Sequence, residues 1–542
     1  MLRSKSILVF KMVLSLALIL SATLTASQGS GTSPEINLID FNISPLEQNN
    51  ETMLYDIGNG SHCGIYVGSN SSCLKEITRL LKVVEGKDGE ALQLIYGLDE
   101  CNNSYAEVVF KFDPPQDLSA FDHLVIDWRG DKTANSLNVG INDTKNQSIA
   151  PLYRNVTQKS WWGPLVVPFK HIGSNLDLSR VERIFISVKN DSDITDYRNE
   201  GGAGSITIDG LRLLKIGERK IPSDFESVKP DLNASGTAAK WLASQQKDTG
   251  LLQSWMEEKN SAHLYDQSLA LIVFCREGMW GPANNLVKTL SELQNKDGSW
   301  NETYNCEDKI VISSKKWLGS IAWMVFALDQ YQDLGGNLSE AKDSMELGAD
   351  WLEERIKQSN DCLNEGPVEG TMDAWWALQA VGRTEMADKI KECLMESYWD
   401  EEMGRFTAGK GDWRPVSDVQ TWGAAFLRAT GEKEKALRAL SYAREALLVT
   451  SQDQKVTALG DQAGPWSVSN ECTGQYIVAG GEGSNQFLQE LVSQQRYDGA
   501  MPGSPDNFKG AGAWNTQWHG VAPTAWLYFA SNKGPFNFDM AK

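Results

Sequence analysis

The chain is poor in the residues that build metal sites and nucleic-acid interfaces. Its 542 residues include only five histidines and eight cysteines, and it has no Cys-x-x-Cys pair or His/Cys cluster, which argues against a zinc site. Lys and Arg total 51 against 71 Asp and Glu, so the net charge is −20 and no basic stripe can displace phosphate counterions. These shortages exclude nucleic acid and disfavour heparin-like polyanions as partners, whereas neutral polymers remain open.

Long hydrophobic runs are also scarce, because after residue 26 no segment is long and apolar enough to cross a bilayer. The first 26 residues have a basic start, the apolar run Val13–Leu20 and the small-residue segment Ser21–Ala26, which together are typical of a signal peptide. We therefore predict a secreted or cell-surface, extracellular protein. An uncleaved signal that acts as an anchor is the alternative.

Asn-x-Ser/Thr sequons are abundant, and their number supports export. Ten of the twelve precede residue 235, so we expect a glycoprotein whose N-terminal half carries most of the sugar. The twelve are Asn42, Asn50, Asn59, Asn70, Asn102, Asn142, Asn146, Asn155, Asn190, Asn233, Asn301 and Asn337. An Asn/Ser-rich surface that is never glycosylated is the alternative.

The eight cysteines divide three and five between the two halves of the chain. Either each half keeps an unpaired thiol or one disulfide joins the halves. An exported chain permits disulfides. Cys63 and Cys73, ten residues apart in a Gly/Ser-rich stretch, are the first pair that we expect.

The first half of the chain has the alternation of β-strands. After a polar segment at 27–50, interpreted as a spacer, residues 51–216 alternate apolar with polar residues between turn signals. This pattern predicts an antiparallel β-sandwich. Seven strands are predicted, at 91–96, 106–112, 123–128, 136–141, 163–169, 183–188 and 205–212. Residues 217–232, with two prolines and several charges, are the predicted linker.

Three phrases of this half, Asp117–Asp131, Trp161–Phe169 and Ile206–Leu211, carry a family likeness. In their order they resemble the galactose-binding-like jelly rolls, including carbohydrate-binding module family 11. The resemblance implies a carbohydrate-binding module, and such modules often carry structural calcium, which is not located by these phrases. Four aromatic residues are candidates for stacking on sugars, with core packing as the alternative for each tryptophan. They are Trp128, Tyr153, Trp161 and Trp162.

The second half changes to the helical period of 3.6 residues. One set of predicted helices has a polar face, as helices exposed to solvent do: 235–246, 282–294, 338–357, 384–399, 433–448 and 484–495. The other set is nearly free of charge and must be buried on every side: 264–274, 317–331, 371–381, 419–429, 473–480 and 522–531. Six solvated helices that alternate strictly with six buried ones predict an (α/α)6 toroid over 233–542, following the β-domain in a multidomain chain.

A partial internal repeat supports this prediction. Three outer helices end in similar phrases, at Gln246–Gly250, Gln294–Trp300 and Gln495–Gly499, where Asp-Thr-Gly or Asp-Gly supplies the helix stop and turn. In an alternating toroid the inner helices run parallel, so their N-termini gather at one end of the ring. That end is where we look for a site.

Carboxylates and aromatic residues are interleaved at these N-termini and in the loops leading to them. The candidate catalytic residues are Asp266, Glu369, Asp373, Asp418 and Glu471. The candidate substrate contacts are Trp255, His263, Tyr265, Trp300, Tyr304, Trp317, Trp422, Trp466, Trp514, Trp518 and His519. Glycoside hydrolysis needs this combination, because one carboxylic acid protonates the leaving oxygen, a carboxylate activates water and aromatic rings position the sugars. Asp266 also has an alternative interpretation as a helix cap without chemistry.

The phrases at these helix starts are 265–271, 368–375, 418–422, 466–471 and 522–526. Their layout is similar to the six-hairpin glycosidases and to glycoside hydrolase family 8. The resemblance implies a glycoside hydrolase that needs no cofactor and acts on a polysaccharide or oligosaccharide, by an inverting mechanism with two of the five carboxylates roughly 6.5–9.5 Å apart. Asp266 stands where family 8 opens its first inner helix with Ser-Glu-Gly, so acid and base roles do not transfer directly.

Two other functions are compatible with the same fold. A polysaccharide lyase would use a Tyr or His base and a cation that neutralises a uronate, for which Lys316, Arg414 and His519 are the available material. A non-catalytic glycan-binding or envelope protein would have lost the carboxylate pair. A terpene cyclase shares the Gln294…Trp300 phrase as a ring-stabilising motif, but the chain has no Asp-x-Asp-Asp acid motif.

Overall fold

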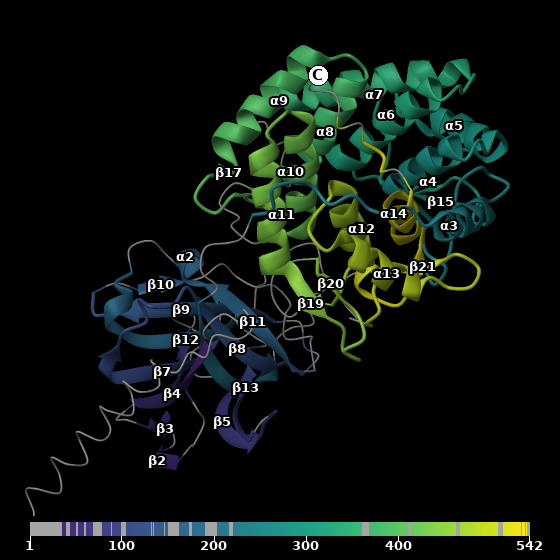
Figure 1. Ribbon diagram of the computed structural model, residues 1–542. Coiled ribbons are helices and arrows are strands. Elements are labelled where there is room, and N and C mark those ends of the chain that lie inside the picture. The colour runs from purple at the N-terminus through teal and green to yellow at the C-terminus, as the bar shows by residue number, and fades with distance from the viewer. Residues whose placement is uncertain are drawn as a thin grey trace, which may run out of the picture.

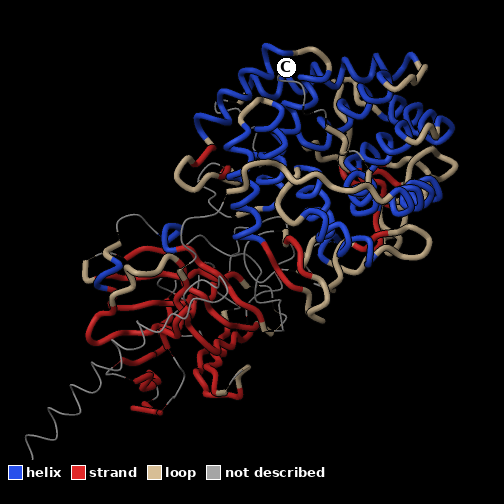
Figure 2. The backbone as a smooth tube through the Cα atoms, viewed as in Figure 1, coloured by secondary structure: helices blue, strands red, loops and turns tan. Residues whose placement is uncertain are grey.

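The computed structural model has a β-rich N-terminal region and a helical C-terminal region (Figures 1 and 2). It describes residues 35–39, 44–49, 52–58, 61–68, 78–87, 89–98, 105–131, 133, 135–145, 147–149, 162–172, 176–189, 203–215, 221–359, 368–409, 415–461, 467–507, 513–532, 534–536 and 538. The predicted signal peptide, Trp161, Trp466 and Arg414 lie outside these residues. No helix in the described ranges is both long enough and apolar enough to span a membrane.

Two antiparallel sheets form the N-terminal region. The first has the order β11-β8-β13-β6-β5, with β1 also on β13, and its strands are β1 (Glu35–Ile39), β5 (Thr78–Glu85), β6 (Glu90–Gly97), β8 (His123–Arg129), β11 (Gly163–Pro168) and β13 (Ala203–Leu214). The second has the order β10-β9-β12-β7-β4-β3-β2, and its strands are β2 (Ser44–Asn49), β3 (Thr52–Gly58), β4 (Ser61–Gly68), β7 (Tyr105–Gln116), β9 (Ser136–Asp143), β10 (Gln147–Ile149) and β12 (Val181–Lys189). All seven predicted strands are confirmed.

The predicted spacer at 27–50 is partly wrong, because it contains two strands. β1 pairs with the end of the last strand, β13, and β2 pairs with β3. The few apolar residues of β1 are enough to form a strand, because β1 pairs along one edge only, with β13, and its Leu38 packs against the core. Trp128 is also part of that core, with 1% of its surface exposed, so it does not stack on a ligand. Trp162 is half-buried beneath the guanidinium of Arg129.

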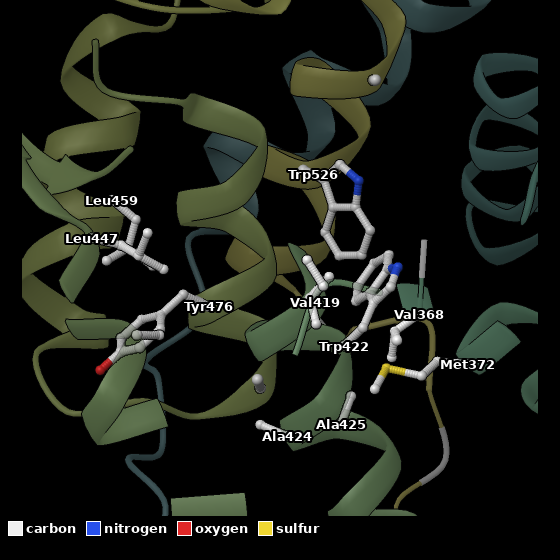
Figure 3. Packing of buried hydrophobic residues seen from close by; sticks show 14 of the residues in the cluster. Val368, Met372, Val419, Trp422, Ala424, Ala425, Leu447, Leu459, Tyr476 and Trp526 are labelled. Carbon is white, nitrogen blue, oxygen red and sulfur yellow. The ribbon is translucent and has the colours of Figure 1, made fainter. Parts of the chain in front are cut away.

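Helices occur at all twelve predicted positions, with ends within three residues of the predictions. The outer helices are α3 (Leu232–Ser244), α5 (Trp280–Leu293), α7 (Ser339–Gln358), α9 (Thr384–Ser397), α11 (Lys433–Leu447) and α13 (Ser484–Gln494). The inner helices are α4 (Leu264–Arg276), α6 (Leu318–Asp333), α8 (Val368–Ala380), α10 (Ser417–Ala429), α12 (Asn470–Ala479) and α14 (Val521–Ser531). Their apolar side chains are buried together, as Figure 3 shows for Trp422 and Trp526.

The inner helices contact one another in succession. α4 packs on α6, α6 on α8, α8 on α10, α10 on α12 and α12 on α14, and α14 returns to α4. Short hairpins precede several of them, among them β14 (Ser261–His263) with β15 (Thr303–Asn305) and β16 (Val311–Ser313), and β19 (Leu448–Thr450) with β20 (Thr457–Leu459). The closed succession of contacts places the inner N-termini around one shared space.

The repeated Gln phrases clasp neighbouring outer helices. The side-chain amide of Gln294 donates to the carbonyl oxygens of Gly298 and of Ser344 on α7. Gln246 makes the same pair of bonds to its own turn and to α5, and Gln495 to its own turn and to α3. The turns need glycine, since Gly298 has φ of 86° and an added Cβ would lie 2.1 Å from a carbonyl oxygen of α7.

The predictions on cysteines and sequons can be compared with the structure only at residues that it describes. Cys393 is disulfide-bonded, whereas Cys275, Cys306 and Cys472 are free and buried. The predicted Cys63–Cys73 pair lies outside the side chains that the structure describes. Asn301 is 9% exposed, so this sequon is a poor glycosylation site.

Candidate active site

The second residue of five inner helices lines one cavity of about 530 Å³. These residues are Tyr265 of α4, Gly319 of α6, Glu369 of α8, Asp418 of α10 and Glu471 of α12. Residues four apart share a helix face, so one turn deeper the same face presents Trp323, Asp373 and Gln475, which also line the cavity. Neighbouring first-turn residues of α6, α8 and α12 complete the lining, among them Ser320, Gly370 and Cys472.

Five carboxylates line the cavity. Four were candidates, namely Glu369, Asp373, Asp418 and Glu471, and the fifth, Asp461, was missed. Asp461 follows strand β20, and its backbone carbonyl accepts the amide of Ser417 at the start of α10, at 2.8 Å. One signal for Asp461 is present in the sequence, namely a Gly-Asp dipeptide in a loop that leads to an inner helix.

Burial and mutual repulsion keep protons on this cluster. Burial is the main cause that raises the pKa of Glu369 well above its usual range, and the carboxyls of Asp373 and Glu471 add to it. Burial, then Asp418, does the same to the pKa of Asp373, and burial, then Glu369 and Asp461, to the pKa of Asp418. Because these carboxyls are buried close together, they do not all ionise at once. Neutral acids and carboxylates therefore coexist in the cavity.

Glu471 differs from the other carboxyls because a tyrosine hydroxyl donates a hydrogen bond to it. The Tyr265 hydroxyl donates to Glu471 Oε1 at 2.9 Å, and the Trp526 indole N–H donates to that hydroxyl at 2.9 Å. Gln475 adds a longer contact of 3.5 Å. Burial raises the pKa of Glu471 to about 8, but the bond from Tyr265 opposes the rise. Among the carboxyls that the inner helices bring to the cavity, Glu471 is the one whose charged form a tyrosine hydroxyl stabilises.

Tryptophan rings form the floor below the carboxylates. Trp323, Trp422 and Trp526 lie with ring centroids 5.0–6.1 Å apart, and all three are buried. The indole N–H groups of Trp323 and Trp422 have no hydrogen-bond partner at bonding distance. They nevertheless face Asp373 and Glu369 closely enough to oppose the rise in pKa of these two carboxyls. The floor thus places two buried N–H donors beside the cavity carboxyls.

Gly319 gives Asp373 its place. A Cβ at Gly319 would lie 2.7 Å from Asp373 Oδ2 and 3.3 Å from the Cα of Gly370. Helices α6 and α8 therefore approach closely at their N-termini because both carry glycine there.

Asp266, the third residue of α4, does not line the cavity. It is buried among Ser254, His263 and Glu258, on the side of the helix turned toward the loops. Burial raises its pKa to about 6, Glu258 adds to the rise, and His263 and Ser254 oppose it. Burial lowers the pKa of His263, but its acidic neighbours outweigh this effect and raise it. His263 also hydrogen-bonds Thr303, so this group ties α4 to the β15 hairpin.

The other predicted contacts divide between the cavity and the core. Trp317 and Trp514 line the cavity, with Trp317 37% exposed. Trp300 and Tyr304 are fully buried, and the Trp300 indole donates to a carbonyl oxygen of α5, so the prediction that they contact substrate is wrong. Trp255 packs on the backbone of Gly520.

Three further candidates lie apart from the cavity or beneath it. Trp422 is in the floor, Trp518 is exposed outside the cavity lining, and His519 hydrogen-bonds Glu257. Lys316 lines the cavity and forms an ion pair with Asp297. Histidine is absent from the described cavity lining. In the described part of the chain, no group of three or more His, Cys, Asp or Glu is arranged to hold a metal ion.

Comparison with known proteins finds similarity in structure only. No protein-family model matches the chain, and no curated protein matches its sequence. A glycosidase, solved also as a variant in complex with glucose, covers 55% of this chain and 95% of its own, at 12% identity and a TM-score of 0.45. A D-mannose isomerase covers the same shares, at 13% identity and a TM-score of 0.43. A family 11 carbohydrate-binding module from Clostridium thermocellum, in complex with a β-1,3-1,4-mixed-linked tetrasaccharide, covers 34% of this chain and 98% of its own, at 19% identity and a TM-score of 0.23.

The chemistry of this chain follows from the residues that line its cavity.

Proposed function

We propose that the protein is a secreted glycoside hydrolase that acts on a polysaccharide or oligosaccharide with inversion at the anomeric carbon. Its helical region is an (α/α)6 toroid and its β-region a jelly roll that binds carbohydrate. The observation that carries the proposal is the cavity in which five carboxylates stand over a tryptophan floor. Its volume is within the range of small-ligand sites, and its polar groups converge on one space.

Glu471 is the proposed general base, because the Tyr265 hydroxyl stabilises its charged form. Glu369 is the proposed general acid, because burial and two neighbouring carboxyls keep its proton on. Helix α10 lies between the helices that carry them, in keeping with the wide separation that an inverting enzyme needs for water. Water attacks the anomeric carbon as Glu471 takes its proton, and Glu369 gives its proton to the glycosidic oxygen, which leaves as an alcohol.

A lyase is less well supported by the same cavity. The pKa of Tyr265 is raised well above its usual range by burial and by Glu471, so its hydroxyl is a poor base. The ionised members of the carboxyl cluster would also repel a uronate, and Lys316 is already paired with Asp297. These charges favour a neutral sugar. Export is supported by the disulfide at Cys393, and calcium in the β-region stays a proposal taken from the family likeness.

The test is a panel of neutral glycans, with the anomer of the first product followed by NMR. Wild type should release an inverted product, and Glu471→Gln should lose at least a thousandfold in kcat/KM, within the range of a lost acid or base. Glu277→Gln is the matched control, since Glu277 also accepts from a tyrosine, Tyr528, at 2.7 Å, but just beyond the other end of α4. Binding without turnover on every glycan would identify a non-catalytic glycan-binding protein instead.

A further inference from the structure

The last described residues of the chain return to the centre of the helical region. Phe536 is 9% exposed, and its ring stacks on Trp376 with centroids 4.4 Å apart and planes at 29°. It also contacts Trp323 at 5.8 Å and Trp422 at 5.5 Å. Phe536 therefore packs beneath the tryptophan floor of the cavity, although it follows the last helix.

Two arginines at helix ends hold this segment. Arg276, in the last turn of α4, donates to the carbonyl oxygens of Gly534 at 2.8 Å and of Pro535 at 3.2 Å. Arg428, in the last turn of α10, lies 3.9 Å over the ring of Phe538. The segment is therefore tied to two inner helices at the end opposite to the cavity mouth.

The two floor tryptophans that Phe536 touches are those with unpartnered indole N–H groups. Trp323 is 3% exposed and Trp422 is 2% exposed, and neither Nε1 has a partner at bonding distance. A buried unpaired N–H is costly, so its orientation needs support from packing. Trp323 is the fourth residue beyond Gly319 and Trp422 the fourth beyond Asp418, so both lie on the cavity face of their helices.

We propose that Phe536 is a positioning residue of the active site, which wedges Trp323 and Trp422 so that their indole N–H groups face the carboxyls of Asp373 and Glu369. The inference rests on the proposed function, since it makes these two donors part of the support for the proposed acid–base cluster. It predicts that a change beneath the floor, without any contact to substrate, alters turnover and proton transfer.

The experiment compares Phe536→Ala with Phe538→Ala. Phe538 is an aromatic of the same segment, and its contacts in the described residues include Trp376 and Phe536 but neither Trp323 nor Trp422. Phe536→Ala should lower kcat/KM by about tenfold to a hundredfold, as expected for a shift of catalytic groups by about 1 Å. Phe538→Ala should stay within about threefold of wild type, and Phe536→Leu, which refills most of the space, should fall between the two.

The pH profile separates positioning from mere stability. The indole N–H of Trp422 favours the charged form of Glu369, so its loss raises the pKa of that acid further and moves the alkaline limb of kcat/KM to higher pH. A lower melting temperature with unchanged kcat/KM and an unchanged limb would overturn the proposal. If Phe536→Ala does not fold, Arg276→Gln, which loosens the same segment at its anchor, provides the same comparison.

A binding measurement keeps this proposal separate from that of hydrolysis. The best-binding neutral oligosaccharide of the panel is titrated by calorimetry into Glu471→Gln, with and without Phe536→Ala. A tenfold or greater loss of affinity supports the wedge even if wild type cleaves nothing, whereas equal affinity in the two proteins contradicts it.

Discussion

Asp266 has different surroundings from the carboxyls of Glu369, Asp418 and Glu471, although all four lie in the first turn of an inner helix. Glu369, Asp418 and Glu471 are second residues and line the cavity, whereas Asp266 is the third residue of α4 and is buried among loop residues. One residue step turns a side chain by about 100° around a helix axis, which suffices to move it from the cavity face to the loop face. In α4 the cavity position belongs to Tyr265. The third residues of α6, α8 and α12, namely Ser320, Gly370 and Cys472, also line the cavity, so the turn of the third residue toward the loops is a feature of α4.

The fourth residues of α4 and α10 are glutamines that hold loops rather than line the cavity. The amide side chain of Gln267 exchanges hydrogen bonds with the backbone of Leu252, and that of Gln420 with the backbone of Phe406. Both fix the hairpin or loop that precedes their helix. In α4 and α10 the second residue therefore lines the cavity and the fourth anchors a loop, whereas the fourth residue of α8, Thr371, also lines the cavity.

The largest effect expected in this comparison tests the difference between Asp266 and the cavity carboxyls directly. Glu369→Gln and Asp418→Asn should each lower kcat/KM by about a hundredfold or more, because they remove carboxyls from the cavity. Asp266→Asn, the matched change one step around the helix, should remain within about threefold of wild type. A loss at Asp266 as large as that at Glu369 would break the comparison between second and third residues.

A smaller effect is expected where the second residue is not a carboxylate. Tyr265→Phe removes the donor to Glu471 and should lower kcat/KM by about tenfold, the cost of one hydrogen bond to a charged group. The bond lowers the pKa of Glu471, so its loss raises that pKa above about 8. The base must be ionised, and the acid limb of the pH–rate profile should therefore move to higher pH.

Tyr528→Phe is the control, since its hydroxyl donates to Glu277, beyond the far end of α4. It should leave the acid limb where wild type has it. An unmoved limb in Tyr265→Phe would remove Glu471 from the role of base.

Most of the architecture could be predicted from the sequence, but the helical phase of the site could not. Hydrophobic period and helix stops located every helix, because burial on all sides leaves a strong signal. Predicted starts of α8, α10 and α12 were two or three residues late, since Glu369, Asp418 and Glu471 read as polar boundaries rather than first-turn residues. Without the correct first residue of each helix, the sequence could not show that Glu471 lines the cavity and Asp266 does not.

Other errors have the same physical origin, namely that long-range packing leaves little local signal. Asp461 stands in a loop, and Phe536 follows the last helix, so neither falls on a periodic pattern. The Gln294–Trp300 phrase has two interpretations in the sequence, a motif that stabilises the ring of helices and, for Trp300, a contact to substrate. Gln294 does hold neighbouring outer helices together. The Trp300 side chain fills the space over Gly348 of α7.

A still smaller effect is expected from the glycine at the second position of α6. Gly319→Ala would place a Cβ 2.7 Å from Asp373 Oδ2, so that carboxyl must shift. We expect kcat/KM to fall about threefold to tenfold, because the methyl group meets the Asp373 carboxyl first, and a smaller loss of stability, because the Cα of Gly370 lies 3.3 Å away. Gly236→Ala in α3, where an added Cβ meets nothing within 4 Å, is the control. Equal activity of the two variants would show that the position of Asp373 does not matter for turnover.

The smallest effect on activity, at Asp266, should come with a measurable effect on stability. Its folded pKa of about 6 exceeds the ordinary value of 3.8 because of burial, so the folded state holds the proton more tightly than the unfolded chain. The contribution of the protonated Asp266 carboxyl to the free energy of unfolding is therefore complete below about pH 4. It is lost as the pH rises through 6, by on the order of 2–3 kcal/mol. Asp266→Asn cannot ionise, and its unfolding free energy should change less between pH 4 and pH 7.

Chemical denaturation at pH 4, 5.5 and 7 measures this slope. Asn also brings N–H donors to the place of Asp266 Oδ2, which has no hydrogen-bond partner, so a constant offset between the two proteins is expected at every pH. The slope is independent of that offset and is the quantity to compare. If the variant keeps the wild-type slope and yet loses activity, the Asp266 carboxylate contributes to catalysis rather than to helix anchoring, and the third residue of α4 must then be grouped with the second residues.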